Sequence, residues 1–419
     1  MTPTTKYSAS AVRLAVTHAF PITRLSPVPE SLTRPGSSSR MSKFSHVRSF
    51  QSRKFSAVKR GRSSPERIKS IPPIARHFLS NMAAHSENSR THHVVVALET
   101  FFVAVPPLDL PAGHTYELRE YSRTRPEDVA ERIRDADILL VTVVPVPAAA
   151  LRAEASPRLK MIAVVASGTD NVDLAACRAR GIVVANTPHC NAVSVAEHAV
   201  ALYFAARRSV ALSHTLVRAG AWAKDGPLQK TLYDPDGKMP RTSRDETLGI
   251  VGYGAVGKLL ETTAKALGMK VLVSGRKGAS TAPEGRTPFE TLIRESSVIV
   301  LCLPRSPETL NMISETELNS MKPYAVIVNV SRGGIVDEKA LVVALRTRRI
   351  AGYGTDVYET EPAGPENSLL VGPDTADLNL VTTPHVAWCA GDTIANYNRA
   401  TKENIEGWLG AGQPKYPVA

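Results

Sequence analysis

Cysteine and long apolar runs are both scarce in this chain of 419 residues. The four cysteines, Cys177, Cys190, Cys302 and Cys389, lie far apart, without a Cys-x-x-Cys pair or a Cys/His cluster. This spacing argues against a disulfide framework and against a zinc site, and it is typical of a reducing compartment. No apolar run approaches the roughly 18 residues of a membrane-spanning helix. We therefore expect no bound metal and no membrane partner.

Acidic residues are almost missing from the amino-terminal segment. Residues 1–80 hold 15 Lys or Arg but only Glu30 and Glu66 as acids, so the net charge of this segment is 15 − 2 = +13. The net charge of the whole chain is +12. The basic charge therefore belongs to this segment, and the rest of the chain gives no reason to expect a nucleic-acid partner. Its Ser- and Arg-rich composition, without apolar periodicity, predicts a disordered basic extension over residues 1–92.

Three interpretations of this extension stay open. It fits sequence lying upstream of a translation start at Met82, an organelle transit peptide, or a tail that contacts nucleic acid or acidic membrane. We expect a cytoplasmic protein, or a mitochondrial one if the extension is a genuine transit peptide.

From His93 onward, short apolar runs alternate with helical patterns. This alternation predicts an α/β fold with parallel sheets covered on both faces. A long helix is expected over residues 195–217, opened by a capping box of Ser194 and Glu197. A polar, turn-rich connector follows. The first four runs expected to be strands are residues 94–99, 137–144, 159–166 and 182–186.

The segment from Thr247 to Val273 reads as strand, glycine-rich turn, amphipathic helix and strand. Its Gly-x-Gly-x-x-Gly turn consists of Gly252, Gly254 and Gly257. In a dinucleotide-binding fold these three residues permit the tight turn, let the backbone approach the pyrophosphate, and let the helix pack on the strand. The residues before the turn have the apolar pattern of a strand, and those after it have the periodicity of an amphipathic helix. The segment therefore predicts a Rossmann-type nucleotide domain.

Three polar residues follow three later apolar strands. Arg332 comes after residues 325–330, Glu361 after residues 352–357, and His385 after residues 379–383. Because ligands bind outside the carboxyl ends of strands in open parallel sheets, these side chains should meet at the dinucleotide. Arg332 can fork onto a carboxylate or carbonyl, His385 can exchange a proton with an alcohol or ketone oxygen, and Glu361 can orient the imidazole.

Residues from about His93 to Leu409 resemble the D-isomer-specific 2-hydroxyacid dehydrogenases, and most closely their glyoxylate and hydroxypyruvate reductase branch. The stretches that carry the resemblance are ASGTDNVDLAACRARGIVVANTP, VSVAEHAVAL, LGIVGYGAVG, MKPYAVIVNVSRGGIVDEKAL, GTDVYETEP and TPHVAW.

The resemblance assigns roles to individual residues. It places the family's catalytic Arg, Glu and His on Arg332, Glu361 and His385, in agreement with the strand-end argument. It also implies that Asp356 holds the nicotinamide carboxamide. The loop of residues 166–169, with Ser167 and Gly168, would cradle the substrate carboxylate. Trp388 would either wall a small pocket or simply pack at a domain junction. The cofactor site as a whole is expected to comprise Gly252, Gly254, Ala255, Val256, Gly257, Ser274, Arg276, Lys277, Pro304, Val330, Ser331 and Asp356.

One departure from the commonest family pattern concerns the cofactor. Members that prefer NAD have an acidic residue about twenty residues past the glycines, where it binds the ribose hydroxyls. Here Gly275 stands at that place and Arg276 and Lys277 follow it. Cations would attract a 2′-phosphate that a carboxylate would repel. We therefore expect the protein to prefer NADP(H), with NAD(H) as the alternative cofactor. The plainer interpretation of the two cations is that they lie in a solvated turn and bind no cofactor.

The family fold implies a nucleotide domain inserted in a split, flavodoxin-like substrate domain. Residues 93–194 plus 385–419 would form the substrate domain and residues 195–384 the nucleotide domain. The expected activity is reduction of a small 2-oxo acid, glyoxylate or hydroxypyruvate, by a homodimer, with His385 as general acid and base. A nucleotide-sensing transcriptional co-repressor of the same fold is the alternative function; a formate or phosphite dehydrogenase fits the Glu and His arrangement less well.

Overall fold

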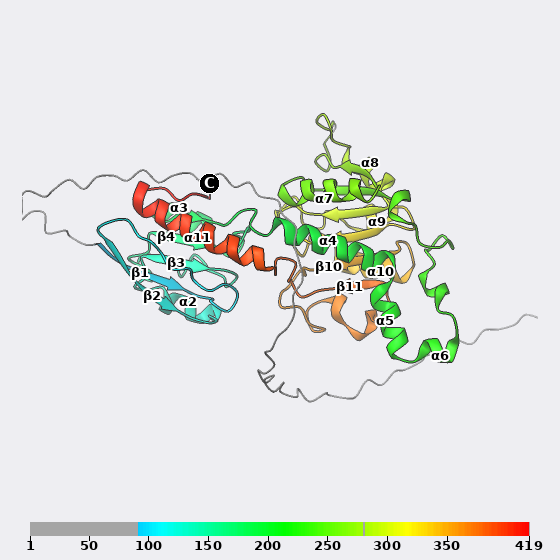
Figure 1. Cartoon of the computed structure of the whole chain (residues 1–419), viewed down its shortest axis with the longest axis horizontal. Coiled ribbons are helices and arrows are strands. Elements are labelled where there is room, and N and C mark those ends of the chain that lie inside the picture. The colour runs from blue at the N-terminus through cyan, green and yellow to red at the C-terminus, as the bar shows by residue number, and fades with distance from the viewer. Residues whose placement is uncertain (1–90, 280, 419) are drawn as a thin grey trace, which may run out of the picture. The chain divides into compact units, whose positions relative to one another are not determined.

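A computed structural model describes residues 91–279 and 281–418. These residues form two parallel β-sheets with helices on their faces, so the expected α/β fold is confirmed (Figure 1). The predictions of disorder and targeting for residues 1–90 lie outside the described part of the chain. Thr91 and His92 begin the first strand, so the predicted boundary of the extension at residue 92 is wrong by two residues. No helix within the described ranges is long and apolar enough to cross a membrane.

The first sheet has the strand order β2-β1-β3-β4-β5, with all neighbours parallel. This order is that of flavodoxin-like sheets, as predicted. Its central strands β3 and β4 are buried along their whole length, which explains why they read as continuous apolar runs. Helices α2 and α3 pack on one face. The bounds are β1 Thr91–Ala97, β2 His114–Glu120, β3 Ile138–Val141, β4 Met161–Val164, β5 Val183–Ala185, α2 Val129–Arg132 and α3 Leu174–Arg180, with a 3-10 turn at Pro126–Asp128.

The second sheet has the order β11-β10-β9-β8-β6-β7 and is also parallel throughout. The winding direction reverses between β6 and β8, and doubly wound sheets bind ligands at the carboxyl ends of such strands. Helices α4 and α7 pack on one face, and α8, α9 and α10 on the other. The bounds are β6 Thr247–Val251, β7 Lys270–Val273, β8 Val298–Leu301, β9 Val326–Asn329, β10 Gly352–Thr355, β11 Leu380–Thr382, α7 Ala255–Ala266, α8 Phe289–Glu295, α9 Glu315–Ser320 and α10 Glu338–Arg346.

The long helix expected over residues 195–217 is two helices, and its predicted capping box is wrong. Helix α4 (Ala192–Arg207) begins after Asn191, and Ser194 lies inside its first turn. The Ser194 hydroxyl donates to the Asn191 carbonyl and lies 3.0 Å from the Thr393 hydroxyl, so a tertiary contact replaces the local cap. Ser209, with φ +45°, breaks the helix before α5 (Val210–Arg218).

The connector between α5 and β6 contains no strand, as expected. It holds the short helix α6 (Ala221–Asp225) and two 3-10 turns at Gln229–Leu232 and Ser243–Asp245; two further 3-10 turns, at Leu369–Val371 and Pro373–Thr375, precede β11.

The last helix of the chain packs against the first sheet. Helix α11 (Gly391–Ala411) lies along β4 (Figure 1). Tyr397 and Ile405 of this helix are buried in one core with strand residues of the first sheet such as Val95 and Met161. The chain thus returns to its first sheet after completing the second.

Candidate active site

The glycine-rich turn after β6 has the geometry that a bound pyrophosphate needs. Gly252 has φ +97°, and a side-chain carbon there would collide with the carbonyl of Cys302. A carbon on Gly257 would collide with the carbonyl of Gly252. At Gly254, by contrast, nothing lies within 4 Å of that position, and no side chain caps the first N–H groups of α7. Open space in front of uncapped N–H groups is a cradle that fits a dinucleotide phosphate.

The three predicted catalytic side chains follow β9, β10 and β11 at the carboxyl edge of the second sheet. His385 Nδ1 lies 2.6 Å from Glu361 Oε2. Glu361 Oε1 accepts a hydrogen bond of 2.9 Å from the Tyr358 N–H, which fixes the carboxylate. Among the described residues, His385 Nε2 has no hydrogen-bond partner. The imidazole is therefore oriented through one nitrogen, and the other is left for a ligand.

The charge state of Glu361 ties Arg332 to this pair. Burial acts to raise the pKa of the Glu361 carboxyl. The hydrogen bond and charge of His385, the Tyr358 N–H and the charge of Arg332 outweigh burial and hold that pKa below its ordinary value. Glu361 is thus ionised at neutral pH, and its carboxylate becomes protonated only as the pH falls through this lowered pKa.

Arg332 meets the predicted substrate loop at Gly168. A side-chain carbon on Gly168 would lie 2.0 Å from Nη2 of Arg332, so the guanidinium can hold this position only beside a glycine. Ser167 points elsewhere, because its hydroxyl lies 3.0 Å from Asn191 Oδ1 and its carbonyl accepts from Asn186 Nδ2. The structure brings Gly168 together with the guanidinium and directs the Ser167 side chain away from it.

Asp356 anchors the turn that carries His385. The Asp356 side chain is 1% exposed. One oxygen accepts from the Thr383 hydroxyl at 2.6 Å and from the Val386 N–H at 2.9 Å, and the other accepts from the Ala387 N–H at 2.8 Å. His385 itself has φ +53°, a conformation that non-glycine residues adopt only when their surroundings hold it. A contact between Asp356 and the nicotinamide stays a prediction, and its carboxylate already has these three donors.

Trp388 supports the same turn from the other side. Its indole N–H donates to the His385 carbonyl at 2.9 Å, and its ring lies 6.3 Å from that of Phe102 and 6.4 Å from that of Tyr397. These contacts are those of packing at a junction, the plainer of the two interpretations. A role as a pocket wall stays a prediction.

The rim beyond β7 holds the two predicted cations in different environments. Lys277 Nζ lies 2.7 Å from Glu317 Oε1 and donates to the Met312 carbonyl, so its charge is already neutralised. Arg276 is exposed, and no hydrogen bond or ion pair of its side chain is seen within the described ranges. Ser274 donates its hydroxyl to the Gly275 carbonyl. Arg276 is thus the cation available to a ligand.

The remaining predicted cofactor residues lie at strand ends of the second sheet. Ala255 and Val256 open α7, and Pro304 follows β8. Val330 and Ser331 follow β9 and are buried. The Ser331 N–H and hydroxyl both donate to Asn329 Oδ1, and Asn329 Nδ2 donates to the Arg332 carbonyl, so Asn329 fixes the turn before the guanidinium.

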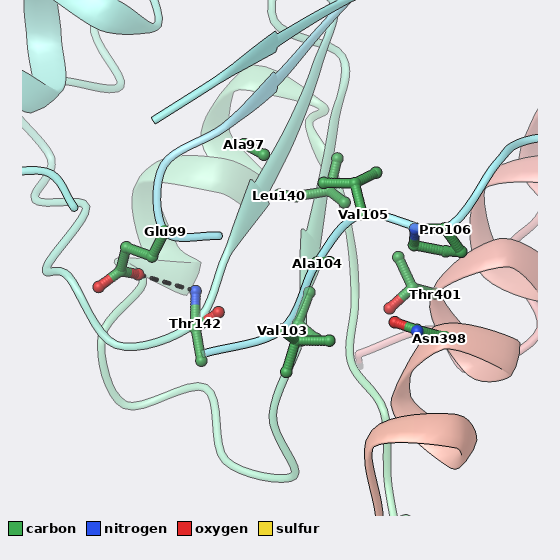
Figure 2. A pocket seen from close by; sticks show the side chains of 11 residues that line it. Ala97, Glu99, Val103, Ala104, Val105, Pro106, Leu140, Thr142, Asn398 and Thr401 are labelled. Atoms are coloured by element: carbon green, nitrogen blue, oxygen red, sulfur yellow. Dashed lines mark hydrogen bonds between the residues drawn. The ribbon is translucent and has the colours of Figure 1, made fainter. Parts of the chain in front are cut away.

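A small cavity of about 10 Å³, partly open to solvent, lies at the carboxyl ends of β1, β3 and β4 (Figure 2). Its polar lining includes Glu99, Thr142 and, from α11, Asn398 and Thr401. The Glu99 carboxylate accepts from the N–H groups of residues 142–144. No lysine, arginine or histidine lines the cavity, so it does not suit an anionic substrate as the Gly168 and Arg332 site does.

Sequence reasoning missed two residues of this site. Asp170 lies 2.8 Å from Arg332 Nε, and Asn329 holds the turn beside it. Both follow or end apolar strands, the same signal that identified Arg332. Among the described residues, no group of three or more His, Cys, Asp or Glu side chains is arranged to hold a metal ion.

Comparison with known proteins agrees with this geometry. The family model of the D-isomer specific 2-hydroxyacid dehydrogenase NAD binding domain matches residues 200–387. Glycerate dehydrogenase of Methylorubrum extorquens is 40% identical over 308 residues, covering 72% of this chain and 92% of the relative. Glyoxylate reductase of Pyrococcus furiosus is 36% identical over 274 residues, 64% of this chain and 77% of the relative.

Among solved structures, an NADPH-dependent glyoxylate/hydroxypyruvate reductase from Sinorhizobium meliloti is 27% identical, with a TM-score of 0.62 over 78% of this chain and 98% of that one. The alternative of a transcriptional co-repressor is not favoured, since these relatives are named as dehydrogenases and reductases. The chain belongs to the D-isomer-specific 2-hydroxyacid dehydrogenases, a family of nicotinamide-dependent oxidoreductases.

Proposed function

We propose that this protein reduces a small 2-oxo acid, glyoxylate or hydroxypyruvate, to the D-2-hydroxy acid, and that it prefers NADP(H) to NAD(H). The observation that carries the proposal is the 2.6 Å pair of His385 and Glu361 on the same sheet edge as Arg332, which lies against Gly168. The names of the relatives, glycerate dehydrogenase and glyoxylate reductase, support this substrate class.

Arg332, His385 and Glu361 divide the work of this reaction. Arg332 binds the substrate and stabilises the negative charge that develops on its carbonyl oxygen. Protonated His385 gives a proton from Nε2 to that oxygen, and Glu361 holds the ring through Nδ1 and balances its charge. A bound nicotinamide cofactor supplies the hydride to the carbonyl carbon. Run in reverse, His385 acts as the base that takes the hydroxyl proton.

The direct test follows nicotinamide absorbance with the full-length protein, glyoxylate or hydroxypyruvate, and either NADPH or NADH. We expect rapid oxidation of NADPH and slower oxidation of NADH. Tight cofactor binding with no turnover on either acid, or on a wider panel of 2-oxo acids, would contradict the proposal and revive a sensing role.

The cofactor preference rests on Arg276, the exposed cation past β7. Arg276→Asp should raise the KM for NADPH roughly 10- to 100-fold, because a charged hydrogen bond to the 2′-phosphate is replaced by repulsion. The KM for NADH should change little. Lys277→Gln is the matched control: since Lys277 is paired with Glu317, this variant should lower the thermal midpoint without changing the NADPH to NADH ratio. Equal effects of Arg276→Asp on both cofactors would refute the preference.

Gly168 gives a steric test of the substrate site. Its φ does not demand glycine, so Gly168→Ala should fold, but the added methyl would lie 2.0 Å from Arg332 Nη2 and would displace the guanidinium. We expect the KM for the 2-oxo acid to rise roughly tenfold or more, because the substrate would lose about one hydrogen bond to a charged group. The dissociation constant for NADPH should be unchanged. An unaltered KM in steady-state kinetics would show that the guanidinium does not work from this position.

We also propose the domain division predicted from the sequence, and a homodimer formed through the nucleotide domain. The packing of α11 on the first sheet supports the split substrate domain. No residue of α5 or α6 is buried within the described chain, and Val210, Val217 and Trp222 are exposed apolar side chains on them. Such a surface favours a partner, here a second copy. Sedimentation would report the oligomer. The cytoplasmic location stays a prediction.

A further inference from the structure

Arg332 is held at two of its three guanidinium nitrogens. Nε donates to Asp170 Oδ2 at 2.8 Å, and Nη1 donates to the Ser331 carbonyl at 2.8 Å. Asp170 follows β4 of the first sheet, whereas Arg332 follows β9 of the second. The planar guanidinium cannot rotate while both bonds are kept, so its orientation is set by one residue of its own turn and by one residue 162 positions away.

The third nitrogen is the one directed at the substrate loop. Nη2 lies 2.0 Å from where a side-chain carbon on Gly168 would be, and it has no hydrogen-bond partner among the described residues. Asp170 Oδ2 is also close, 3.0 Å from where a carbon on Gly168 would be. The acid therefore occupies one edge of the guanidinium and leaves the edge beside Gly168 for an incoming anion.

Neither stability nor attraction explains an acid at this position. The Asp170 side chain is 55% exposed and that of Arg332 33% exposed, and an ion pair this open to solvent contributes little to folding. A carboxylate beside a cation also weakens the attraction of that cation for an anionic substrate. The contact does supply a fixed direction for Nη2. Hydrogen-bond donors that are already in place stabilise the charge that develops in a transition state, and this is usually the largest single contribution to catalysis.

We propose that Asp170 is the positioning residue of Arg332: it holds Nε so that Nη2 is presented to the carboxylate or carbonyl of the substrate. The inference rests on the proposed function of Arg332. Because the contact joins loops that follow strands of different sheets, the guanidinium is aligned only while those two loops are together.

The test measures binding of oxalate, an unreactive 2-oxo acid analogue, to the full-length protein saturated with NADPH. Asp170→Ala should weaken oxalate binding and raise the KM for glyoxylate roughly 10-fold or more, since one hydrogen bond to a charged group is lost. Asp170→Asn should bind oxalate as well as the wild type or better, because its carbonyl oxygen still accepts from Nε while the repelling charge is gone. The NADPH dissociation constant and thermal midpoint should be unchanged in both.

A double-mutant cycle shows whether Asp170 acts through Arg332. Arg332→Gln should weaken oxalate binding by itself, and adding Asp170→Ala should then change it less than about twofold. Two results would overturn the positioning role while leaving the proposed function standing. One is that Asp170→Ala alone binds oxalate as tightly as the wild type or more tightly. The other is that Asp170→Ala weakens oxalate binding as much in the Arg332→Gln protein as in the wild type. If wild-type protein neither binds oxalate nor reduces a 2-oxo acid, or if Arg332→Gln has no effect, the proposed function falls and this inference falls with it.

Discussion

His385→Asn is expected to lower kcat for reduction of the 2-oxo acid about 10²- to 10⁴-fold, the range lost when a general acid is removed. Asparagine is a better replacement than alanine here, because His385 has φ +53° and asparagine tolerates this left-handed backbone. The N–H groups of the turn can then still donate to Asp356, and Trp388 can still donate to the carbonyl of residue 385, so the loss can be ascribed to proton transfer.

Two measurements accompany this variant. The dissociation constant for NADPH, followed by fluorescence, should stay within about twofold of the wild type, since the imidazole is not part of the phosphate cradle. His92→Ala is the matched control and should leave kcat unchanged. His92 is an exposed histidine at the amino end of β1, whereas the Gly168 loop follows the carboxyl end of the parallel strand β4 in the same sheet. Full activity in His385→Asn, or an equal loss of cofactor binding and of thermal stability, would remove His385 as the proposed acid.

The second large effect concerns two glycines of one turn, which should fail in different ways. Gly252→Ala puts a methyl group against the Cys302 carbonyl at φ +97°, so it should destabilise the folded protein by about 1–3 kcal/mol and also weaken cofactor binding. At Gly254, φ is −84° and the surrounding space is open. Gly254→Ala should therefore keep the thermal midpoint of the free protein.

The same Gly254→Ala methyl would stand where the pyrophosphate must approach. We expect the NADPH dissociation constant to rise roughly tenfold or more, about the worth of one charge-assisted hydrogen bond. Thermal denaturation and titration with NADPH, done on both variants, separate the two effects. Loss of stability in Gly254→Ala, or unchanged NADPH binding by it, would contradict the assignment of this turn as the phosphate cradle.

Local features of this fold could be predicted well because a short stretch of sequence determines each of them. The turn at Gly252, Gly254 and Gly257 needs only its own strand and helix, and the structure confirms its backbone. Arg332, Glu361 and His385 could be placed at one edge because every strand of a parallel sheet ends at the same edge.

Features that depend on distant partners could not be predicted. Ser194 has the residue type of a helix cap, but Thr393, near the end of the chain, takes its hydroxyl into a buried contact. Lys277 has the residue type of a phosphate-binding cation, but Glu317, which lies far from it in the sequence, pairs with its ammonium group. The pairing of Asp170 with Arg332 likewise depends on two loops meeting in space. Sequence patterns report periodicity and residue type, and neither specifies which side chains meet across the fold.

The position of α11 bears on how this chain is made. Asn404, fully buried in that helix, donates to the Asn186 carbonyl beyond β5 and accepts from the Tyr416 N–H, while Tyr397 and Ile405 fill the core over the first sheet. During synthesis the first five strands leave the ribosome hundreds of residues before this cover exists, whereas the second sheet can be completed once β11 has emerged. Of the two sheets, the one translated first is thus the last to finish folding, and a ribosome that stalls before α11 would leave the apolar face of that sheet uncovered and prone to aggregation.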